Sequence, residues 1–179
     1  MPSDRAMTAE DDKANILVDR DTDLTERQKA ETRLWLQVLN VHRLIYDDLN
    51  ATMLAGAGLS IPKFDALAHL YRYRDGLSMG ELSKKMKVSN GNVSGLVARL
   101  QKDGYVDRKN AATDRRSFLA TITDSGVEAF EKAVDLHHQV TSEKMAGVPF
   151  DMVEMLASNL KAISDRIRLS RETPTGGND

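Results

Sequence analysis

The stretch "SNGNVSGLVARLQKDGYVDRKNAATDRRSFLATIT", residues 89–123, decides the fold, because the spacing of its apolar residues changes partway along. In the first half they recur at steps of three and four, which predicts a helix with one buried face. These residues are Val93, Leu96, Val97 and Leu100. Gly104 stands where such a helix would end, since glycine accepts left-handed geometry. Beyond it the apolar residues alternate, with an interruption at "NAATD", which predicts two strands joined by an exposed loop.

A second helix start lies just upstream of this stretch. Ser78 is followed three residues later by Glu81, the spacing of a capping box, in which each side chain bonds a free backbone amide. The helix that begins there is about two turns long. We expect Val88 to fill the turn after it and Ser89 to cap the next helix. Residues 58–123 therefore predict a helix-turn-helix followed by a β wing.

The flanking segments also predict helices. Over residues 26–57 two adjacent apolar stripes, one through Leu34 and one through Trp35, cover a wider arc than one packing surface needs. We therefore expect this helix to meet a second chain, although a long core helix within a monomer would also explain the pattern. Ser60 is expected to cap the following helix. Residues 124–170 predict two more helices separated at Pro149, and Thr123 is expected to cap the first of them. We also expect an acidic disordered extension at 1–25 and a flexible tail at 171–179.

Charge is unevenly distributed along a chain whose net charge is -2. Residues 78–123 hold nine lysines and arginines against four acids, whereas both ends of the chain are acidic. A basic centre indicates a polyanion as partner, although a solvated basic face without a partner would give the same count. There is no cysteine, no apolar run of membrane-spanning length and no secretory leader pattern. We therefore expect a cytoplasmic protein without a membrane partner.

The buried stripe of the predicted helix at 89–103 determines which of its residues remain outside. In a helix-turn-helix the second helix lies in the major groove of DNA, with its N-terminal residues toward the base edges. Asparagine suits adenine edges and arginine suits guanine, while Ser89 and the first free amides can hold a phosphate. Capping alone would explain Asn90 and Gly91, but it explains Asn92 and Arg99 poorly. The outward residues are Asn90, Gly91, Asn92, Ser94, Gly95, Ala98, Arg99 and Lys102.

The predicted wing is basic. It carries Arg108, Lys109, Arg115 and Arg116, and an arginine at a loop tip can enter a narrow minor groove. Asp114 stands beside two of these arginines. We expect Asp114 to orient an arginine through a charge-assisted hydrogen bond, with a plain surface salt bridge as the alternative.

These residues resemble the MarR family of bacterial winged-helix regulators. The resemblance lies in "ELSKKMKVSNGNVSGLVARLQKDGYVDR" and "DRRSFLATITDSG", covering about residues 78–126, and the order of elements extends it over about 25–170. It assigns the aspartate–x–arginine motif of the wing to Asp114 and Arg116, and gives Arg116 the minor-groove contact. A proline is common shortly before that aspartate, where this chain has Ala112 and Thr113.

The resemblance implies a mainly α fold with a small β wing, a winged helix-turn-helix with N- and C-terminal dimerisation helices. It also implies a homodimeric repressor on double-stranded DNA, reading an inverted repeat with half-sites about one turn, ~10 bp, apart. Binding should weaken steeply with salt. A small anionic effector would release it, and the stretch "NGNVSGLVARL" resembles that of family members that respond to aromatic acids or their CoA thioesters. The lining residues would be Trp35, His42, Arg43, Tyr46, Phe64 and Arg72, although ordinary core or surface roles would also explain them.

Other functions are less consistent with the sequence. There is no glycine-rich phosphate loop, nucleophile elbow or cluster of metal ligands, so we expect no enzyme, no cofactor and no metal. Cysteine-based sensing is impossible. His137 and His138 are adjacent and should face different sides of a helix, which argues against zinc. The remaining alternative is a winged helix that contacts only other proteins, without an effector.

Overall fold

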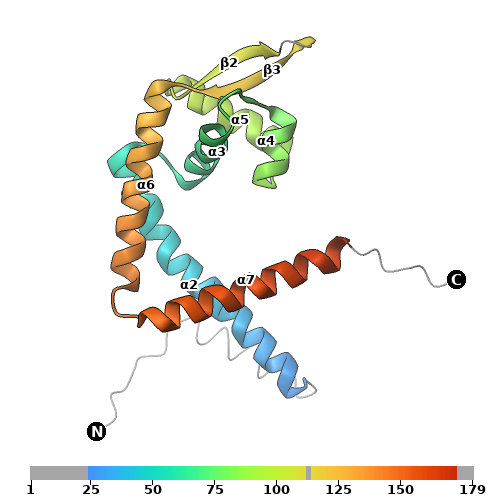
Figure 1. Ribbon diagram of the computed structural model, residues 1–179, viewed down its shortest axis with the longest axis vertical. Coiled ribbons are helices and arrows are strands. Elements are labelled where there is room, and N and C mark those ends of the chain that lie inside the picture. The colour runs from blue at the N-terminus through green and yellow to red at the C-terminus, as the bar shows by residue number, and fades with distance from the viewer. Residues whose placement is uncertain (1–23, 112–113, 173–179) are drawn as a thin grey trace, which may run out of the picture. The chain divides into compact units, whose positions relative to one another are not determined.

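The computed structural model describes residues 24–111 and 114–172, together with the side chains of these residues except 110, 111, 114–117, 171 and 172. The described residues up to Thr141 form one compact unit, and those from Ser142 form a second. The first unit holds seven elements and most of α6 (Figure 1). The elements are α2 (Glu26–Ala57), α3 (Ile61–Arg72), β1 (Leu77–Ser78), α4 (Met79–Met86), α5 (Asn90–Lys102), β2 (Val106–Ala111), β3 (Asp114–Ile122), α6 (Asp124–Met145) and α7 (Phe150–Glu172).

Helix α2 is the long N-terminal helix that the two apolar stripes predict. Thr25 caps it in a capping box with Gln28, and Gly58 ends it with φ of 67°. Gly56 lies within the helix. A Cβ there would meet the Leu136 side chain of α6 at 2.6 Å, so glycine permits a close approach of the two helices. Only Leu49 and Met53 are buried, so most of the predicted apolar arc is not covered within the chain.

The helix-turn-helix is formed by α4 and α5. The predicted capping box is confirmed: the Ser78 hydroxyl accepts from the amide of Glu81 at 3.2 Å, and the Glu81 carboxylate accepts from the amide of Ser78 at 2.9 Å. The turn passes through Lys87 in left-handed geometry, with φ of 56°. The prediction that Val88 fills the turn is wrong, since Val88 is 39% exposed. The turn is instead held by the Ser83 hydroxyl, which donates to the Val88 carbonyl at 2.5 Å.

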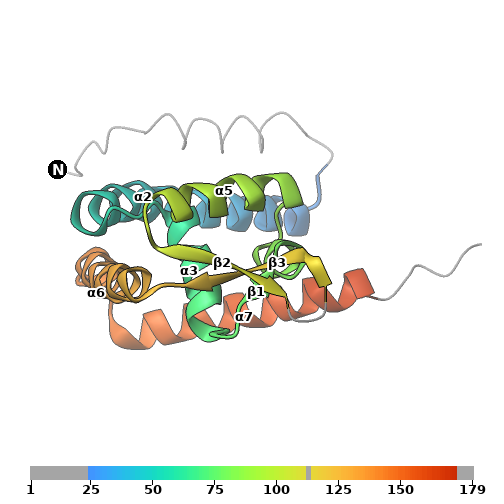
Figure 2. The ribbon, with the colours of Figure 1, turned by 90° about the horizontal axis from the view of Figure 1, so that it is seen from above.

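The wing belongs to a three-stranded antiparallel sheet in the order β1-β3-β2, where the sequence predicted two strands. The third strand, β1, pairs Leu77 with Ala120 and Ser78 with Leu119, and two residues are too few to show an alternating pattern. The sheet covers α3 and α5 on one side (Figures 1 and 2). The alternation of apolar residues predicted for β3 matches burial only in part. Phe118, toward the loop end of the strand, is 46% exposed.

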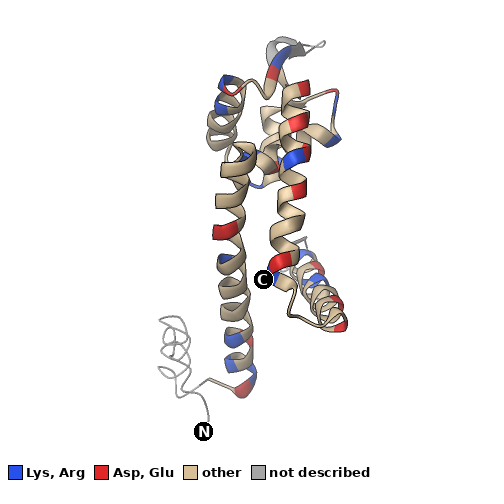
Figure 3. Cartoon of the chain, turned by 90° about the vertical axis from the view of Figure 1, so that its left-hand side faces the viewer, with Lys and Arg blue, Asp and Glu red and all other residues tan. Residues whose placement is uncertain are grey.

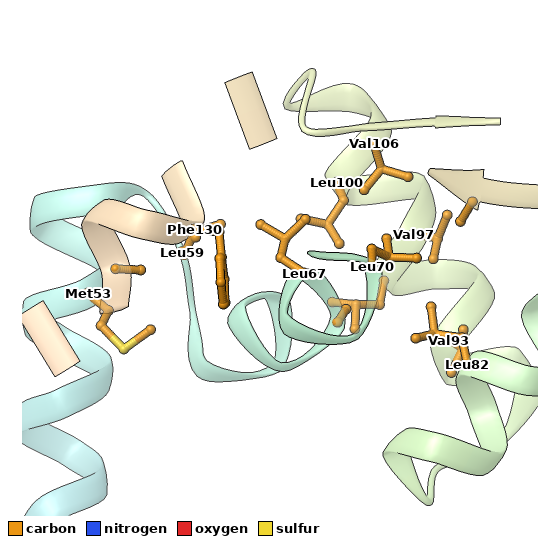
Figure 4. Close-up of a cluster of buried hydrophobic side chains, with 14 of the residues drawn as sticks. Met53, Leu59, Leu67, Leu70, Leu82, Val93, Val97, Leu100, Val106 and Phe130 are labelled. Atoms are coloured by element: carbon orange, nitrogen blue, oxygen red, sulfur yellow. The ribbon is translucent and has the colours of Figure 1, made fainter. Parts of the chain in front are cut away.

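The core lies around α3, whose buried Leu67 and Leu70 are in the middle of the apolar cluster (Figure 4). Met53 and Phe130 lie on one side of α3, and the stripe of α5 lies on the other. That stripe is confirmed, with Val93, Leu96, Val97 and Leu100 all buried. Close packing of this stripe fixes the rotation of α5 about its own axis.

Two predicted helix caps have different outcomes. Ser60 precedes α3, but its side chain makes no capping bond. The Asn50 side chain of α2 instead accepts from the amide of Ile61 at 3.1 Å, a contact between residues eleven apart that sequence spacing does not reveal. Thr123 caps α6 as predicted, accepting from the amide of Gly126 at 3.0 Å.

Helix α7, in the second unit, extends slightly beyond the predicted range. None of its described side chains is buried, and most of its large apolar side chains are exposed. They are Phe150, Met152, Met155, Leu156, Leu160, Ile163, Ile167 and Leu169. None of the described helices is long and apolar enough to pass through a membrane.

The two serines at helix starts make a matched pair for testing the capping box. We expect Ser78→Ala to lower the free energy of unfolding by about 1 kcal/mol, because α4 loses an amide partner at its first turn. Ser60→Ala should cost no more than a few tenths of that, since Ser60 makes no capping bond. Urea unfolding followed by circular dichroism would measure both, and equal losses would contradict the assignment.

The capping box of Ser78 and Glu81 also leads to a prediction about the pKa of Glu81. The Ser78 side chain and amide lower the pKa of Glu81 by bonding its ionised form. The pKa is therefore lower in the folded chain than in the unfolded one. Ionised Glu81 stabilises the fold at pH above the ordinary pKa, and this stabilisation is lost as the pH falls through the lowered pKa of the folded chain. Ser78→Ala should return the pKa of Glu81 toward its ordinary value, which NMR titration would show.

Candidate nucleic-acid interface

The first turn of α5 presents free backbone amides to solvent. Ser89 caps the helix, and its hydroxyl accepts from the amide of Asn92 at 3.4 Å. The side chains of Ser89, Asn90 and Asn92 are exposed. A helix start of this kind, with a positive dipole end and unused amides, suits an anion such as a phosphate.

The outward face of α5 agrees closely with the sequence prediction. Asn90, Gly91, Asn92, Ala98, Arg99 and Lys102 are exposed, whereas Ser94 and Gly95 are half-buried. No acidic residue lies between Ser89 and Lys102. The structure therefore places small polar groups at the start of the helix and two cations toward its end.

The Arg99 side chain passes over Gly95. The Arg99 guanidinium lies back along the helix, with Nη1 3.6 Å from the point where a Cβ on Gly95 would stand. Helical side chains project toward the N-terminus, so this positive charge lies nearer the start of the helix than its Cα does.

The described part of the wing adds two cations. Arg108 pairs with Ala120 and Lys109 with Leu119, and both side chains are exposed. As consecutive strand residues they point to opposite faces of the ribbon. Asp114, Arg115 and Arg116 belong to β3, but their side chains lie outside the described residues, as do Ala112 and Thr113 entirely.

Sequence reasoning gave no role to the lysines of α4 and its turn. Lys84 and Lys87 are exposed, and the Lys85 ammonium lies 3.9 Å above the ring of Tyr73. Hydrogen bonding and charge from Lys85 lower the pKa of Tyr73. The lysine run "SKKMK" could have predicted contacts to phosphates, because the first helix of a helix-turn-helix crosses the DNA backbone.

Two of the acids in this region are occupied by internal contacts. Glu81 is held by Ser78 in the capping box. Asp103, just beyond α5, accepts from the Lys63 ammonium at 2.6 Å. Neutralising Asp103 removes a negative charge that would otherwise oppose a polyanion near the end of α5.

The predicted effector residues are only partly brought together. His42 and Tyr46 contact each other on α2, with ring centroids 5.2 Å apart. Phe64 instead stacks between α3 and α6, 5.2 Å from Phe130 and 5.8 Å from His137. The other three, Trp35, Arg43 and Arg72, are exposed.

A hollow of about 280 Å³ lies between α3 and α6. Tyr71, Phe130 and Val134 supply apolar walls, and the Tyr71 hydroxyl donates to the Glu131 carboxylate at 2.9 Å. Glu131 and Asp135 make its rim acidic, which is unfavourable for an anionic effector. Its volume is also below the ~300–1,000 Å³ usual for small-molecule sites.

The described residues include no group of three or more potential metal ligands. His137 is half-buried against Phe64, while His138 is exposed. The two rings therefore have different surroundings, as helical geometry predicted.

Fold and surface together define a winged helix-turn-helix protein of the nucleic-acid-binding kind. Comparison with known proteins identifies the family within this class. Residues 57–117 match the MarR family. A crystal structure of a MarR family transcriptional regulator from Silicibacter pomeroyi is 42% identical, with a TM-score of 0.70, over 80% of this chain and 99% of that one. The chain therefore belongs to the MarR family of transcriptional regulators, as its sequence motifs predicted.

Two curated relatives are transcriptional regulators. The HTH-type transcriptional repressor YetL of Bacillus subtilis is 29% identical over 119 residues, which is 66% of this chain and 71% of YetL. The transcriptional activatory protein BadR of Rhodopseudomonas palustris is 37% identical over 76 residues, 41% of this chain and 43% of BadR.

Proposed function

We propose that this chain is a homodimeric repressor that binds an inverted-repeat operator and is released by a small anionic aromatic effector. The observation that carries the DNA-binding part is the division of α5 into two faces. One face is buried against the core, and the other exposes Asn90, Asn92 and Arg99 without an intervening acid. This arrangement matches the two contacts a major-groove helix needs, phosphate binding and base-edge reading.

A solved neighbour supports the placement of this fold on DNA. Sco3205 of Streptomyces coelicolor, described as a MarR family transcriptional regulator in complex with DNA, has a TM-score of 0.68. Its identity of 24%, over 85% of this chain and 95% of that one, makes this a likeness of fold.

The dimer part of the proposal rests on apolar side chains that the single chain leaves uncovered. On α2, Trp35 is 59% exposed and Leu39 is 43% exposed. No Lys, Arg, Asp or Glu occurs from Leu34 to His42, and Figure 3 shows this part of α2 as tan turns beyond the charged first turns. Helix α7 separately exposes Leu156 and Ile163. Exposed apolar patches of this kind are typical of protein interfaces, and a second copy would bury both rows.

An operator selected from random DNA would test base reading. We expect Asn92→Ala to weaken operator binding by about 1–3 kcal/mol, because a bidentate base contact is lost. Arg116→Ala should also weaken it, through the wing. Lys132→Ala removes a positive charge from exposed α6 surface and should leave affinity nearly unchanged. Full binding by both Asn92→Ala and Arg116→Ala in a gel-shift titration would rule out this reading mode.

A charge placed on the uncovered apolar rows would test the dimer. We expect Leu39→Glu or Ile163→Glu to convert the dimer to monomer and to reduce operator affinity more than tenfold, since one reading helix alone loses the linked half-site. Gln37→Glu, on an exposed polar position of α2, is the control. Sedimentation would measure the mass, and a monomeric wild type would contradict the proposal.

Two parts of the proposal, repression and the aromatic effector, rest on the similarity of this chain to other proteins. YetL is named a repressor and BadR an activator, and repression is the usual mode that the family resemblance implies. CouR of Rhodococcus jostii has the same fold and was crystallised with p-coumaroyl-CoA, at 20% identity and a TM-score of 0.62 over 81% of this chain and 95% of CouR. This fold can therefore hold an aromatic CoA thioester.

Effector binding is tested by titrating the dimer with aromatic acids and with their CoA thioesters. A true effector at a hundred times its Kd should stabilise the protein by about 2.7 kcal/mol and lower operator affinity. Arg43→Gln and Arg72→Gln should weaken the response if these cations meet the anionic group. A melting temperature and an operator affinity that no compound of either class shifts would remove the aromatic effector.

The alternative is a winged helix that binds only other proteins. It accounts for the exposed Val88 and Phe118 but gives no role to the acid-free face of α5. Failure of the wild-type protein to bind any DNA duplex at low ionic strength would favour this alternative.

A further inference from the structure

The three residues that follow α5, Asp103, Gly104 and Tyr105, contact several other elements at once. We call these three residues the α5–β2 junction. They lie at the opposite end of α5 from Asn90 and Asn92, the proposed reading residues. The junction therefore holds the far end of the helix, while the reading end packs against α4 through the buried Val93 and turns together with α4.

One contact ties the junction to α3. The Lys63 ammonium, in the first turn of α3, donates to the Asp103 carboxylate at 2.6 Å across a sequence separation of 40. The Lys63 side chain is 18% exposed and that of Asp103 is 33% exposed, so the pair is screened less than an open surface pair. Lys63 lies six residues beyond the end of α2, so this bond connects α5 to the start of α3 and, through it, to the proposed dimerisation helix.

The other contacts tie the junction to α6. The Thr123 hydroxyl donates to the Gly104 carbonyl at 2.7 Å, and the Thr123 amide donates to the Tyr105 carbonyl at 3.0 Å. A Cβ on Gly126 would overlap that same Tyr105 carbonyl, so α6 begins in direct contact with the junction. Main-chain bonds and close packing make this side stiff. On the α3 side the apolar stripe of α5 packs in the shared core, and the Lys63–Asp103 pair is the polar bond that adds a fixed direction to that packing.

A small rotation at the junction has a large effect at the reading end. Helix α5 has 13 residues and is therefore about 20 Å long. Turning it by about 10° at one end moves the other end by roughly 3.4 Å, which is about the rise of one base pair. In a twofold dimer both reading ends move, so a change of this size in the angle alters their separation by about one to two base-pair rises.

We propose that Lys63, through its bond to Asp103, is the positioning residue that sets the half-site spacing this regulator accepts. The proposal rests on the dimeric DNA binding proposed above. Lys63 contacts no base in this scheme. It holds α5 at one angle to α3, so that operators with one base pair more or less between half-sites are disfavoured.

The test compares operators of different spacing. The selected operator and versions with one base pair inserted or removed at the centre are titrated with wild type, Lys63→Met and Lys63→Arg. We expect Lys63→Met to reduce the ratio of operator affinities, best spacing over altered spacing, by about two- to fivefold, the upper part of the range for a single salt bridge. Lys63→Arg should keep the wild-type ratio because it preserves the pair. Lys161→Met, which breaks a Lys–Asp pair of the same 2.6 Å length within α7, is the matched control.

The ratio of affinities distinguishes a positioning role of Lys63 from a general effect of charge or of protein stability on DNA binding. An unpaired Asp103 would repel all operators alike, and a less stable fold would weaken all of them alike, so neither changes the ratio. Should Lys63→Met fail to fold, the isosteric Asp103→Asn carries the same expectation.

Failure of this inference is distinct from failure of the proposed function. Wild type that binds no duplex overturns both. Wild type that binds an operator but shows no spacing preference, or whose preference survives Lys63→Met and Asp103→Asn, overturns only the role of Lys63.

A second measurement needs no DNA. Because the chain has no cysteine, Ala98→Cys on the exposed face of α5 gives a unique spin-label site. We expect the distribution of label distances within the dimer to broaden in Lys63→Met and to stay as in wild type for Lys161→Met. An unchanged distribution in Lys63→Met would contradict the proposal.

Discussion

The packing of one apolar stripe determines how this protein presents its functional surface. Val93, Leu96, Val97 and Leu100 are buried against the elements around α3, and a close-packed core allows them only one rotation of α5. The opposite face of the helix is then forced outward. The polar residues at its start need no separate mechanism to expose them, because the burial of the stripe does so.

A second constraint is the amount of apolar surface that a single chain can cover. Helix α2 buries only Leu49 and Met53, and α7 buries none of its described residues. Leaving such rows in water is unfavourable, and a second copy of the chain would remove them from it. In the proposed dimer, the same apolar rows that hold the copies together also bring two reading helices to one duplex. Stability and function would then share a single interface.

The sequence predicted the helices, the caps at Ser78, Ser89 and Thr123, and the buried stripe, because each depends on residues within a turn or two of one another. It also predicted the family correctly, since the motif is contiguous. It missed β1, whose two residues carry no period, and the Asn50 cap of α3, which bridges eleven residues. It assigned Val88 to the interior because an apolar residue in a turn looks buried, whereas Ser83 satisfies that turn.

For the functional surface, the sequence by itself determined the chemistry: asparagines and a capping serine at one end of a helix, cations at the other, and no acid between them. Chemistry of this kind follows from local order and from helical periodicity. Only the tertiary structure decided that Phe64 packs against α6, away from the aromatic residues of α2, and that Asp103 is neutralised by a lysine 40 residues away. Contacts between distant segments depend on how the helices fold together, and no periodicity in the chain encodes them directly.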